Sequence, residues 1–390
     1  MALKTVSELK DSIAGLLSGV DLNNVDNVNG AIERAVRKLV QRAAVPEASA
    51  TQNLNLYSGV FNYPCDDKIF GTAINDIKPQ GNTRSVTNYV YKKPPADFDR
   101  TKGFNWNGTQ ASFGYVNGDP IIQISSVLTQ QKINIDPMNE TTGWTAAGSA
   151  SGLARDTAVY YESPASLRFI LTGSSTGTLT KTLTSTLDMT SYEDVGVAFL
   201  ALRIPDGATA SNLTSLTLKL GSDSGNYNDV SDTEGFLGAW VAGEWLLVAF
   251  DFAGASQTGT PNWAAIDYVQ ISFAHTGTFT NIRVGGLWIA LPTPVQILYQ
   301  TAAVFKAGTA ATSETITDSD DSIILSNPAY TLLEYEGAIS VLQQTGASED
   351  SQVMQGFKKD LNGDGSDVGL YARFRGDNPS QQLRTIGNWY

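Results

Sequence analysis

The sequence predicts an α+β protein of several domains, in which helices at both ends enclose an inserted antiparallel β-sandwich. Two patterns predict this fold. Apolar residues recur every three or four positions near both ends, whereas they alternate with polar residues in short runs through the middle. The chain has 390 residues, enough for two or three domains. With 42% hydrophobic and 17% charged residues, it has the composition of a folded protein.

Two amphipathic helices are predicted near the beginning of the chain, over residues 3–17 and 26–43. The second carries basic residues near its C-terminal end, where they complement the helix dipole, and Pro46 stops it. The apolar stripe of the first helix comprises Leu3, Val6, Leu9, Ile13, Leu16 and Leu17.

A small β region follows, and its clearest element is a hairpin. The alternating runs 109–116 and 120–128 flank Asn117-Gly118, a dipeptide typical of two-residue hairpin turns. Residues 1–128 are therefore interpreted as one part of the protein, composed of helices and a small β region.

Residues 129–296 are rich in Thr, Ser and Gly and contain at least six short alternating runs. Short strands with turn residues between them and almost no helix indicate a β-sandwich. This segment has seven basic and 15 acidic residues, a net charge of −8, so it is expected to face solvent. The strands are predicted at 166–171, 195–204, 213–220, 244–252, 266–273 and 282–289.

Residues 297–390 are predicted to become helical again and to end in an extended tail, 377–390. The helices are expected at 328–344, 347–361 and 366–375. Because chain ends often lie close together in space, these helices are expected to complete a helical bundle with those of residues 1–128.

Composition excludes several classes of protein. The net charge of −13 argues against a basic nucleic-acid binder. One cysteine, Cys65, excludes an intrachain disulfide and multi-cysteine zinc sites. No apolar run reaches the ~20 residues of a membrane span, so no membrane partner is expected. Charged residues interrupt the N-terminus before any signal-peptide core, so synthesis in the cytoplasm is expected.

Catalytic signatures are weak, and we expect the protein not to be an enzyme. The one histidine, His275, lies at a predicted strand end, and no Gly-x-Ser-x-Gly motif occurs. A strand-end histidine that is either at the surface or hydrogen-bonded explains it better than a catalytic triad. Acidic residues such as Glu234, Glu244 and Asp251 could be paired for glycoside hydrolysis, but any acidic sandwich offers such pairs.

One segment is a weak candidate for Ca²⁺, and no other cofactor is expected. Asp360, Asn362 and Asp364 occur at alternate positions before Gly365, as in the first half of a calcium loop. The twelfth position is Tyr371, where a bidentate glutamate belongs. A polar linker between helices is the simpler explanation.

Aromatic side chains in loops of the sandwich are candidates for glycan contact. Tyr227 and Trp263 lie in predicted loops with polar neighbours. Trp245 and Trp288 lie in apolar runs and are expected in the core.

The sandwich resembles the jelly roll of carbohydrate-binding modules. The resemblance rests on 161–170 (YESPASLRFI), on 245–272, with its W-x-x-V-x-F-D-F start, and on the closing run 282–289 (IRVGGLWI). These modules often carry an acidic residue in that last strand, where this chain has Gly285-Gly286. The resemblance implies a jelly-roll fold and a surface for glycans.

The flanking segments resemble head-to-tail adaptor proteins in the neck of tailed bacteriophages. The similar stretches are 29–46, 56–80 and 373–390. The resemblance implies a homo-oligomeric ring, commonly a dodecamer, docked under the portal protein. It implies that the tail inserts between portal subunits, where Leu383, Arg384, Ile386, Trp389 and Tyr390 would bind.

The sequence therefore predicts a non-enzymatic virion protein of the phage neck, which takes part in genome ejection. Its predicted partners are the portal protein, other neck or tail proteins, and DNA that passes without sequence-specific binding, since an acidic wall repels it. The alternative is a phage decoration or receptor-binding protein whose jelly roll binds host surface glycans. Loss of glycan binding in Trp263→Ala is the prediction that belongs to this alternative.

Overall fold

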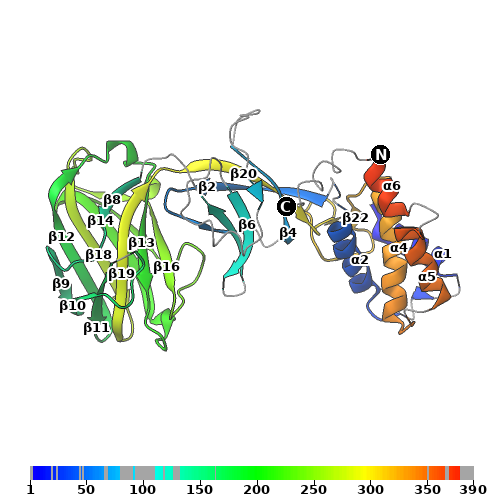
Figure 1. Cartoon of the computed structure of the whole chain (residues 1–390), viewed down its shortest axis with the longest axis horizontal. Coiled ribbons are helices and arrows are strands. Elements are labelled where there is room, and N and C mark those ends of the chain that lie inside the picture. Colours follow the sequence, from blue (N-terminus) through cyan, green and yellow to red (C-terminus); the bar gives the residue numbers. More distant parts are fainter. Residues whose placement is uncertain are drawn as a thin grey trace. The chain divides into compact units, whose positions relative to one another are not determined.

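The chain folds into two compact units, each described here by itself (Figure 1). The first comprises Met1–Asn53, Asp66–Lys78 and Gln296–Tyr390, and the second comprises Leu54–Cys65 and Pro79–Val295. Most of residues 54–128, which the sequence analysis grouped with the N-terminal helices, thus belong to the unit that contains the sandwich. The computed structural model describes residues 3–18, 21–22, 25–43, 45, 48–65, 69–79, 91–92, 110–116, 119–125, 132–162, 164–348, 351–364 and 369–377.

The first unit contains five helices among the described residues. Thr5 and Glu8 form a capping box at the start of the first helix, because each side chain accepts a hydrogen bond from the other's backbone N–H. The helices are α1 (Val6–Leu16), α2 (Val28–Arg42), α4 (Asn327–Gln344), α5 (Gln352–Asn362) and α6 (Leu370–Asp377).

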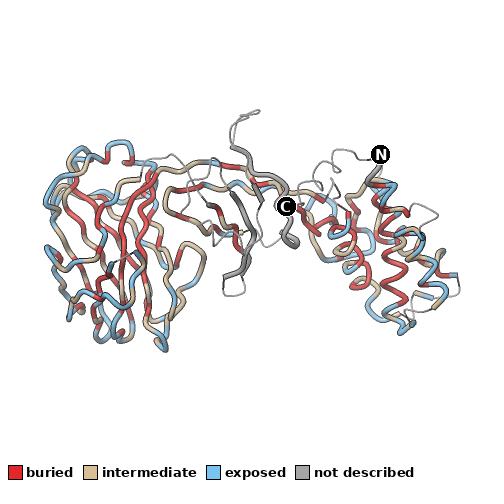
Figure 2. The backbone as a smooth tube through the Cα atoms, in the orientation of Figure 1, coloured by how far each residue is buried: buried red, intermediate tan, exposed pale blue. Residues whose placement is uncertain are grey.

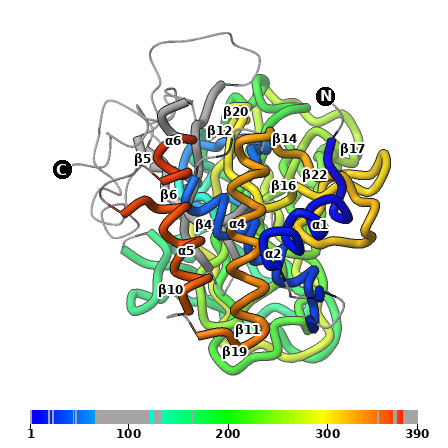
Figure 3. The backbone as a smooth tube through the Cα atoms, turned by 90° about the vertical axis from the view of Figure 1, so that its right-hand side faces the viewer, coloured from blue at the N-terminus to red at the C-terminus, as the bar shows by residue number. Residues whose placement is uncertain are grey.

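Helices from both ends of the chain share one hydrophobic core in this unit. Helix α4 is its centre, with α1, α2, α5 and α6 around it (Figure 3). It is buried on nearly all sides, so apolar residues do not follow a single stripe in its sequence. Gly337 lies where α1 comes close, and a Cβ there would lie 2.6 Å from Ile13 Cδ1, so the Ile13 side chain would have to shift. No helix among the described residues is long and apolar enough to cross a membrane.

The second unit contains the predicted antiparallel β-sandwich, which is confirmed. Two six-stranded sheets enclose a core of buried residues, which are red in Figure 2. The first sheet consists of β10 (Ala150–Asp156), β11 (Ser166–Leu171), β19 (Phe279–Ala290), β13 (Val197–Arg203) and β16 (Trp245–Asp251) in this order, with β8 (Lys132–Asp136) also paired to β19. The second consists of β17 (Ser256–Thr258), β15 (Asn226–Asp232), β14 (Leu213–Asp223), β18 (Ile266–His275), β12 (Ser175–Leu187) and β9 (Trp144–Gly148).

Three smaller sheets complete the fold. The predicted hairpin is confirmed, since β6 and β7 pair antiparallel; its turn, Asn117-Gly118, lies outside the described residues. One sheet has the order β3 (Asn62–Pro64), β7 (Asp119–Ser125), β6 (Gln110–Val116) and β5 (Tyr91–Lys92). Another has the order β2 (Ser49–Leu56), β20 (Thr293–Thr301) and β4 (Ile69–Pro79), and the last β1 (Lys4–Thr5), β22 (Ser322–Ile323) and β21 (Phe305–Lys306).

Aromatic side chains cover the outer face of the first sandwich sheet. Phe199 on β13 lies 5.1 Å from Tyr57, 5.6 Å from Phe236 and 5.7 Å from Trp288, measured between ring centroids. Trp288 Nε1 donates a hydrogen bond to the carbonyl of Ser58 at 3.1 Å. Trp288 is therefore buried as expected, but on the outer side of its sheet and under the segment that precedes β3.

A buried ion pair joins two strands of the first sheet. Arg283 Nε on β19 donates to Asp156 Oδ2 at 2.8 Å, and Ala158 N donates to Asp156 Oδ1 at 2.9 Å. Burial by itself would raise the pKa of Asp156, but the hydrogen bonds from Ala158, Arg283 and Val159 outweigh it and hold this pKa below its usual value.

This depressed pKa predicts a loss of stability in acid. The Asp156 carboxylate stabilises the fold above the unfolded-state pKa of about 3.9, and this contribution is lost as pH falls through the lower folded-state pKa. Asp156→Asn is expected to reduce the unfolding free energy by about 2 kcal/mol at pH 7. Urea unfolding as a function of pH tests this, since the difference between wild type and variant should shrink below about pH 4. A difference that is constant with pH would contradict it.

Candidate functional site

The outer face of the second sandwich sheet carries polar side chains in rows that cross its strands. Strand register places paired residues on the same face, and on this sheet the alternate residues, such as Leu218, Ile271 and Phe273, fill the core. We call the outward rows the open face. The first row is Thr258, Tyr227, Gly221, Tyr268 and Thr182; the second is Ser256, Asp229, Lys219, Gln270, Thr180 and Thr145; the third is Ser231, Thr217, Ser272 and Thr178.

Two tyrosines flank a glycine in the first row. The rings of Tyr227 and Tyr268 lie 6.4 Å apart with an angle of 37° between their planes. Gly221 is necessary between them, because a Cβ there would lie 2.6 Å from Tyr227 Cβ and 2.2 Å from the carbonyl oxygen of Asn226. The glycine thus lets the two aromatic rings approach each other in the middle of the row.

Lys219 lies against Tyr227. Its Nζ donates to the Tyr227 hydroxyl at 3.0 Å and lies 4.1 Å from the ring centroid. The hydrogen bond from Lys219, with a second one involving Thr258, lowers the pKa of Tyr227. Tyr268 is only 9% exposed, and burial raises the pKa of its hydroxyl.

The remaining positions of the open face are mostly neutral hydroxyls and one amide. Gln270 Nε2 donates to Thr180 Oγ1 at 3.1 Å, and the hydroxyls of Thr217 and Ser231 lie 2.7 Å apart. Each of these groups has further donor or acceptor capacity. Lys219 and Asp229 are the charged residues of the three rows, and they are cross-strand partners in register.

The open face is large enough for an extended ligand. Four strand spacings separate β15 from β9, which is about 19 Å. All residues of the three rows except Gly221 and Tyr268 are half-buried or exposed, so solvent reaches their side chains. The face therefore offers an aromatic row beside rows of hydrogen-bonding groups.

Of the two aromatic residues predicted for glycan contact, the structure places only Tyr227 on this face. It lies on β15 rather than in a loop. The prediction that Trp263 contacts a glycan is corrected, because Trp263 is buried. It is 3% exposed and packs edge-on against Phe252, with ring centroids 5.5 Å apart. The segment before β18 turns inward and closes the end of the core. The sequence analysis missed Tyr268, which alternation within the predicted strand could have placed opposite the core.

Trp245 also differs from expectation. It is half-buried and lies outside the sandwich core, on the outer side of its sheet, with its ring 5.7 Å from that of Tyr161. Gly285 lies beside this pair, where a Cβ would make an ordinary contact 3.4 Å from Trp245.

The predicted calcium loop is also corrected. Asp360 and Asn362 belong to the last turn of α5, and two residues at i and i+2 on a helix do not face one side. Asn362 Nδ2 donates to the carbonyl of Lys358 at 2.9 Å, and Asp364 forms an ion pair with Lys359 at 2.6 Å. Among the described residues no cluster of His, Cys, Asp and Glu could hold a metal ion.

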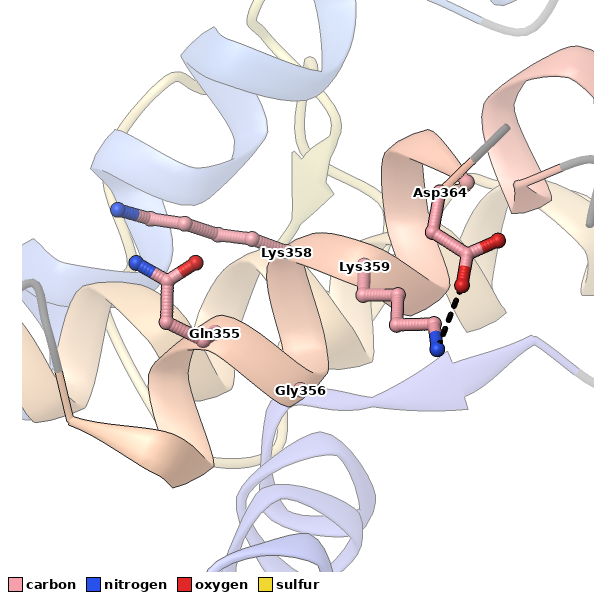
Figure 4. A pocket seen from close by; sticks show the side chains of 6 residues that line it. Gln355, Gly356, Lys358, Lys359 and Asp364 are labelled. Atoms are coloured by element: carbon pink, nitrogen blue, oxygen red, sulfur yellow. Dashed lines mark ion pairs between the residues drawn. The ribbon is translucent and has the colours of Figure 1, made fainter. Parts of the chain in front are cut away.

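A depression lies beside this turn. It has a volume of about 420 Å³, and the ion pair of Lys359 with Asp364 crosses one side of it (Figure 4). Its lining comprises Gln355, Gly356, Lys358, Lys359, Gly363 and Asp364.

His275 is buried at one end of the sandwich, and both of its ring nitrogens are engaged. Nε2 lies 2.6 Å from Ser149 Oγ and Nδ1 lies 2.7 Å from the carbonyl oxygen of Gly277. The ring thereby joins the turn after β9 to the turn after β18. This is the hydrogen-bonded strand-end histidine considered from the sequence.

The predicted portal-docking residues Leu383, Arg384, Ile386, Trp389 and Tyr390 lie outside the described residues. Their role therefore stays a prediction.

No protein-family model matches the sequence, and a search of curated proteins found no match. Similar solved structures include a family 30 carbohydrate-binding module of a Clostridium thermocellum cellulosomal cellulase, at 15% identity and a TM-score of 0.32, covering 41% of this chain and 96% of the module. Another is a family 11 module from the same organism in complex with a β-1,3-1,4-mixed-linked tetrasaccharide, at 12% identity and a TM-score of 0.30, covering 40% of this chain and 94% of that one. At these values the likenesses carry no argument about function, so the proposals below rest on the chain's own geometry.

Proposed function

We propose that the open face binds a glycan chain. The observation that carries this proposal is the row of Tyr227, Gly221 and Tyr268 beside rows of neutral hydroxyls and an amide. A sugar ring presents C–H groups on its faces and hydroxyls around its rim. The C–H faces suit an aromatic ring, and the hydroxyls suit side chains that both donate and accept hydrogen bonds.

Charge favours an uncharged glycan. The segment 129–296 has a net charge of −8, so it repels a polyanion. On the open face itself, Lys219 and Asp229 carry opposite charges in neighbouring strands. The proposed ligands are therefore uncharged glycans on the surface of a host cell. Host surface glycans are also the ligands of the alternative function derived from the sequence.

The proposal is one of binding without hydrolysis. Neutral hydroxyls and the Gln270 amide are poor proton donors and acceptors near neutral pH, whereas glycoside hydrolysis requires a pair of carboxyl groups across the bond. Asp229 is the one carboxylate of the three rows.

Tyr227→Ala tests this function. The variant is expected to bind roughly tenfold more weakly to a glycan that the wild type retains on an array, because stacking on the ring is lost. Affinity is then measured by isothermal titration calorimetry. Tyr160→Ala is the matched control, since Tyr160 is 43% exposed and lies in the loop after β10, off the open face. Equal affinity of Tyr227→Ala and wild type for every ligand found would reject the open face as the site.

A second proposal retains the virion role derived from the sequence. Helices from both ends of the chain share one core, so the sandwich is an insertion into the first unit, and this supports an anchoring unit that carries a binding unit. The proposed partners are a portal protein and other neck or tail proteins, within a homo-oligomeric ring through which DNA passes. Deletion of residues 378–390 is expected to abolish co-purification with the portal protein. Unchanged co-purification would reject the docking tail.

A further inference from the structure

We propose that Lys219 covers the ring of Tyr227 in the free protein, and that a bound sugar must displace it. This inference rests on the proposed glycan binding and concerns the regulation of the same site. It makes Lys219 a competitor of the ligand rather than a contact of it.

The position of the ammonium group carries the inference. Lys219 Nζ is 4.1 Å from the centroid of the Tyr227 ring and 3.0 Å from its hydroxyl oxygen. A sugar that stacks on this ring occupies the same space and uses the same hydroxyl. The ring and its hydroxyl therefore share Lys219 as a partner at the place where a ligand would lie, and Thr258 is a further partner of the hydroxyl.

A lysine is suited to be displaced. Its charge is strongly hydrated and its stem is flexible, so it returns to water at little cost. A cation over an exposed aromatic ring is stabilised only modestly. Asp229 is its cross-strand neighbour, and no ion pair joins the two in this structure, so Lys219 rests on the tyrosine rather than on the carboxylate.

The geometry of the row limits where a ligand can enter. On the other side of Gly221, Tyr268 is only 9% exposed and offers little ring surface. Tyr227 is the more accessible of the two rings. A side chain that lies on Tyr227 therefore blocks most of the aromatic surface of the row. Removal of the Lys219 side chain should therefore cause a measurable change in the affinity for a glycan.

The decisive experiment compares wild type with Lys219→Ala. The variant is expected to bind an uncharged glycan about three- to fivefold more tightly, the worth of an exposed cation–aromatic contact. Arg168→Ala is the matched control, because Arg168 is an exposed cation on β11, in the other sandwich sheet and off the open face. Its affinity should equal that of wild type. If Lys219→Ala binds the glycan more weakly than wild type or equally well, the proposal that Lys219 competes with the ligand is overturned.

A second measurement needs no ligand. NMR titration of Tyr227 should give a higher pKa in Lys219→Ala than in wild type, because the hydrogen bond from the ammonium is lost. An unchanged pKa would show that Lys219 does not rest on Tyr227 and would overturn the cover. If neither wild type nor Lys219→Ala binds any glycan, the proposed function is rejected, and the proposal that Lys219 covers the site is rejected with it. A different outcome rejects only the role of Lys219. In that case wild type binds a glycan, Tyr227→Ala does not, and Lys219→Ala binds with the same affinity as wild type.

Discussion

Replacing Trp263 by alanine is expected to lower the unfolding free energy of the sandwich by about 3–5 kcal/mol while leaving the glycan affinity of the folded protein unchanged. The indole is 3% exposed and packs against Phe252 at the end of the core. Its removal leaves a cavity that the surrounding strands cannot fill, since protein interiors are close-packed. Urea unfolding, followed by circular dichroism, measures the loss of stability.

Trp263→Phe is the matched control for this prediction. Phenylalanine retains an aromatic ring, and the indole N–H that it removes is buried without a hydrogen-bond partner among the described residues. The cost is therefore expected to stay below about 1.5 kcal/mol. If Trp263→Ala were as stable as wild type but did not bind glycan, Trp263 would be a binding residue, as the sequence first indicated.

The β-sandwich was predictable because a sheet with one buried face imposes a period of two on its sequence. Strands near 166–171, 213–220 and 266–273 were located in this way, and each exists. The same alternation placed half of each strand on the outer face. Which outer faces meet solvent was not predictable, since Tyr57 and Phe236 are far from β13 in sequence and cover it only in the folded chain.

Individual site residues were less predictable than strands. The composition of 259–264 (GTPNWA) correctly indicated a loop, but composition says nothing about whether a side chain in a loop turns toward the core. Asp360 and Asn362 fit a calcium pattern because polar residues also suit the exposed end of a helix. Tyr227 and Tyr268 become neighbours only through the register of β14 with β15 and β18, which depends on long-range pairing.

Arg42→Met is expected to destabilise the helical unit by about 3 kcal/mol. Arg42 Nη1 donates to Glu336 Oε1 at 2.9 Å, and the Tyr371 hydroxyl donates to the same oxygen at 2.9 Å. Glu336 lies on the central helix α4 and is 1% exposed. Without the arginine its charge stays buried with one neutral donor, and it is this uncompensated charge that costs stability. The loss is measured by urea unfolding followed through helical circular dichroism.

A second substitution separates charge from packing. Glu336→Gln in the Arg42→Met background removes the buried charge and keeps an oxygen that accepts from Tyr371, so it should restore most of the lost stability. Burial and the nearby carboxylate raise the pKa of Tyr371, which keeps its hydroxyl protonated and able to donate in either protein. If the double variant is no more stable than Arg42→Met alone, the arginine acts through its packed stem rather than its charge. In that case α2, α4 and α6 are joined by apolar contact, and Glu336 contributes no more than its hydrogen bond.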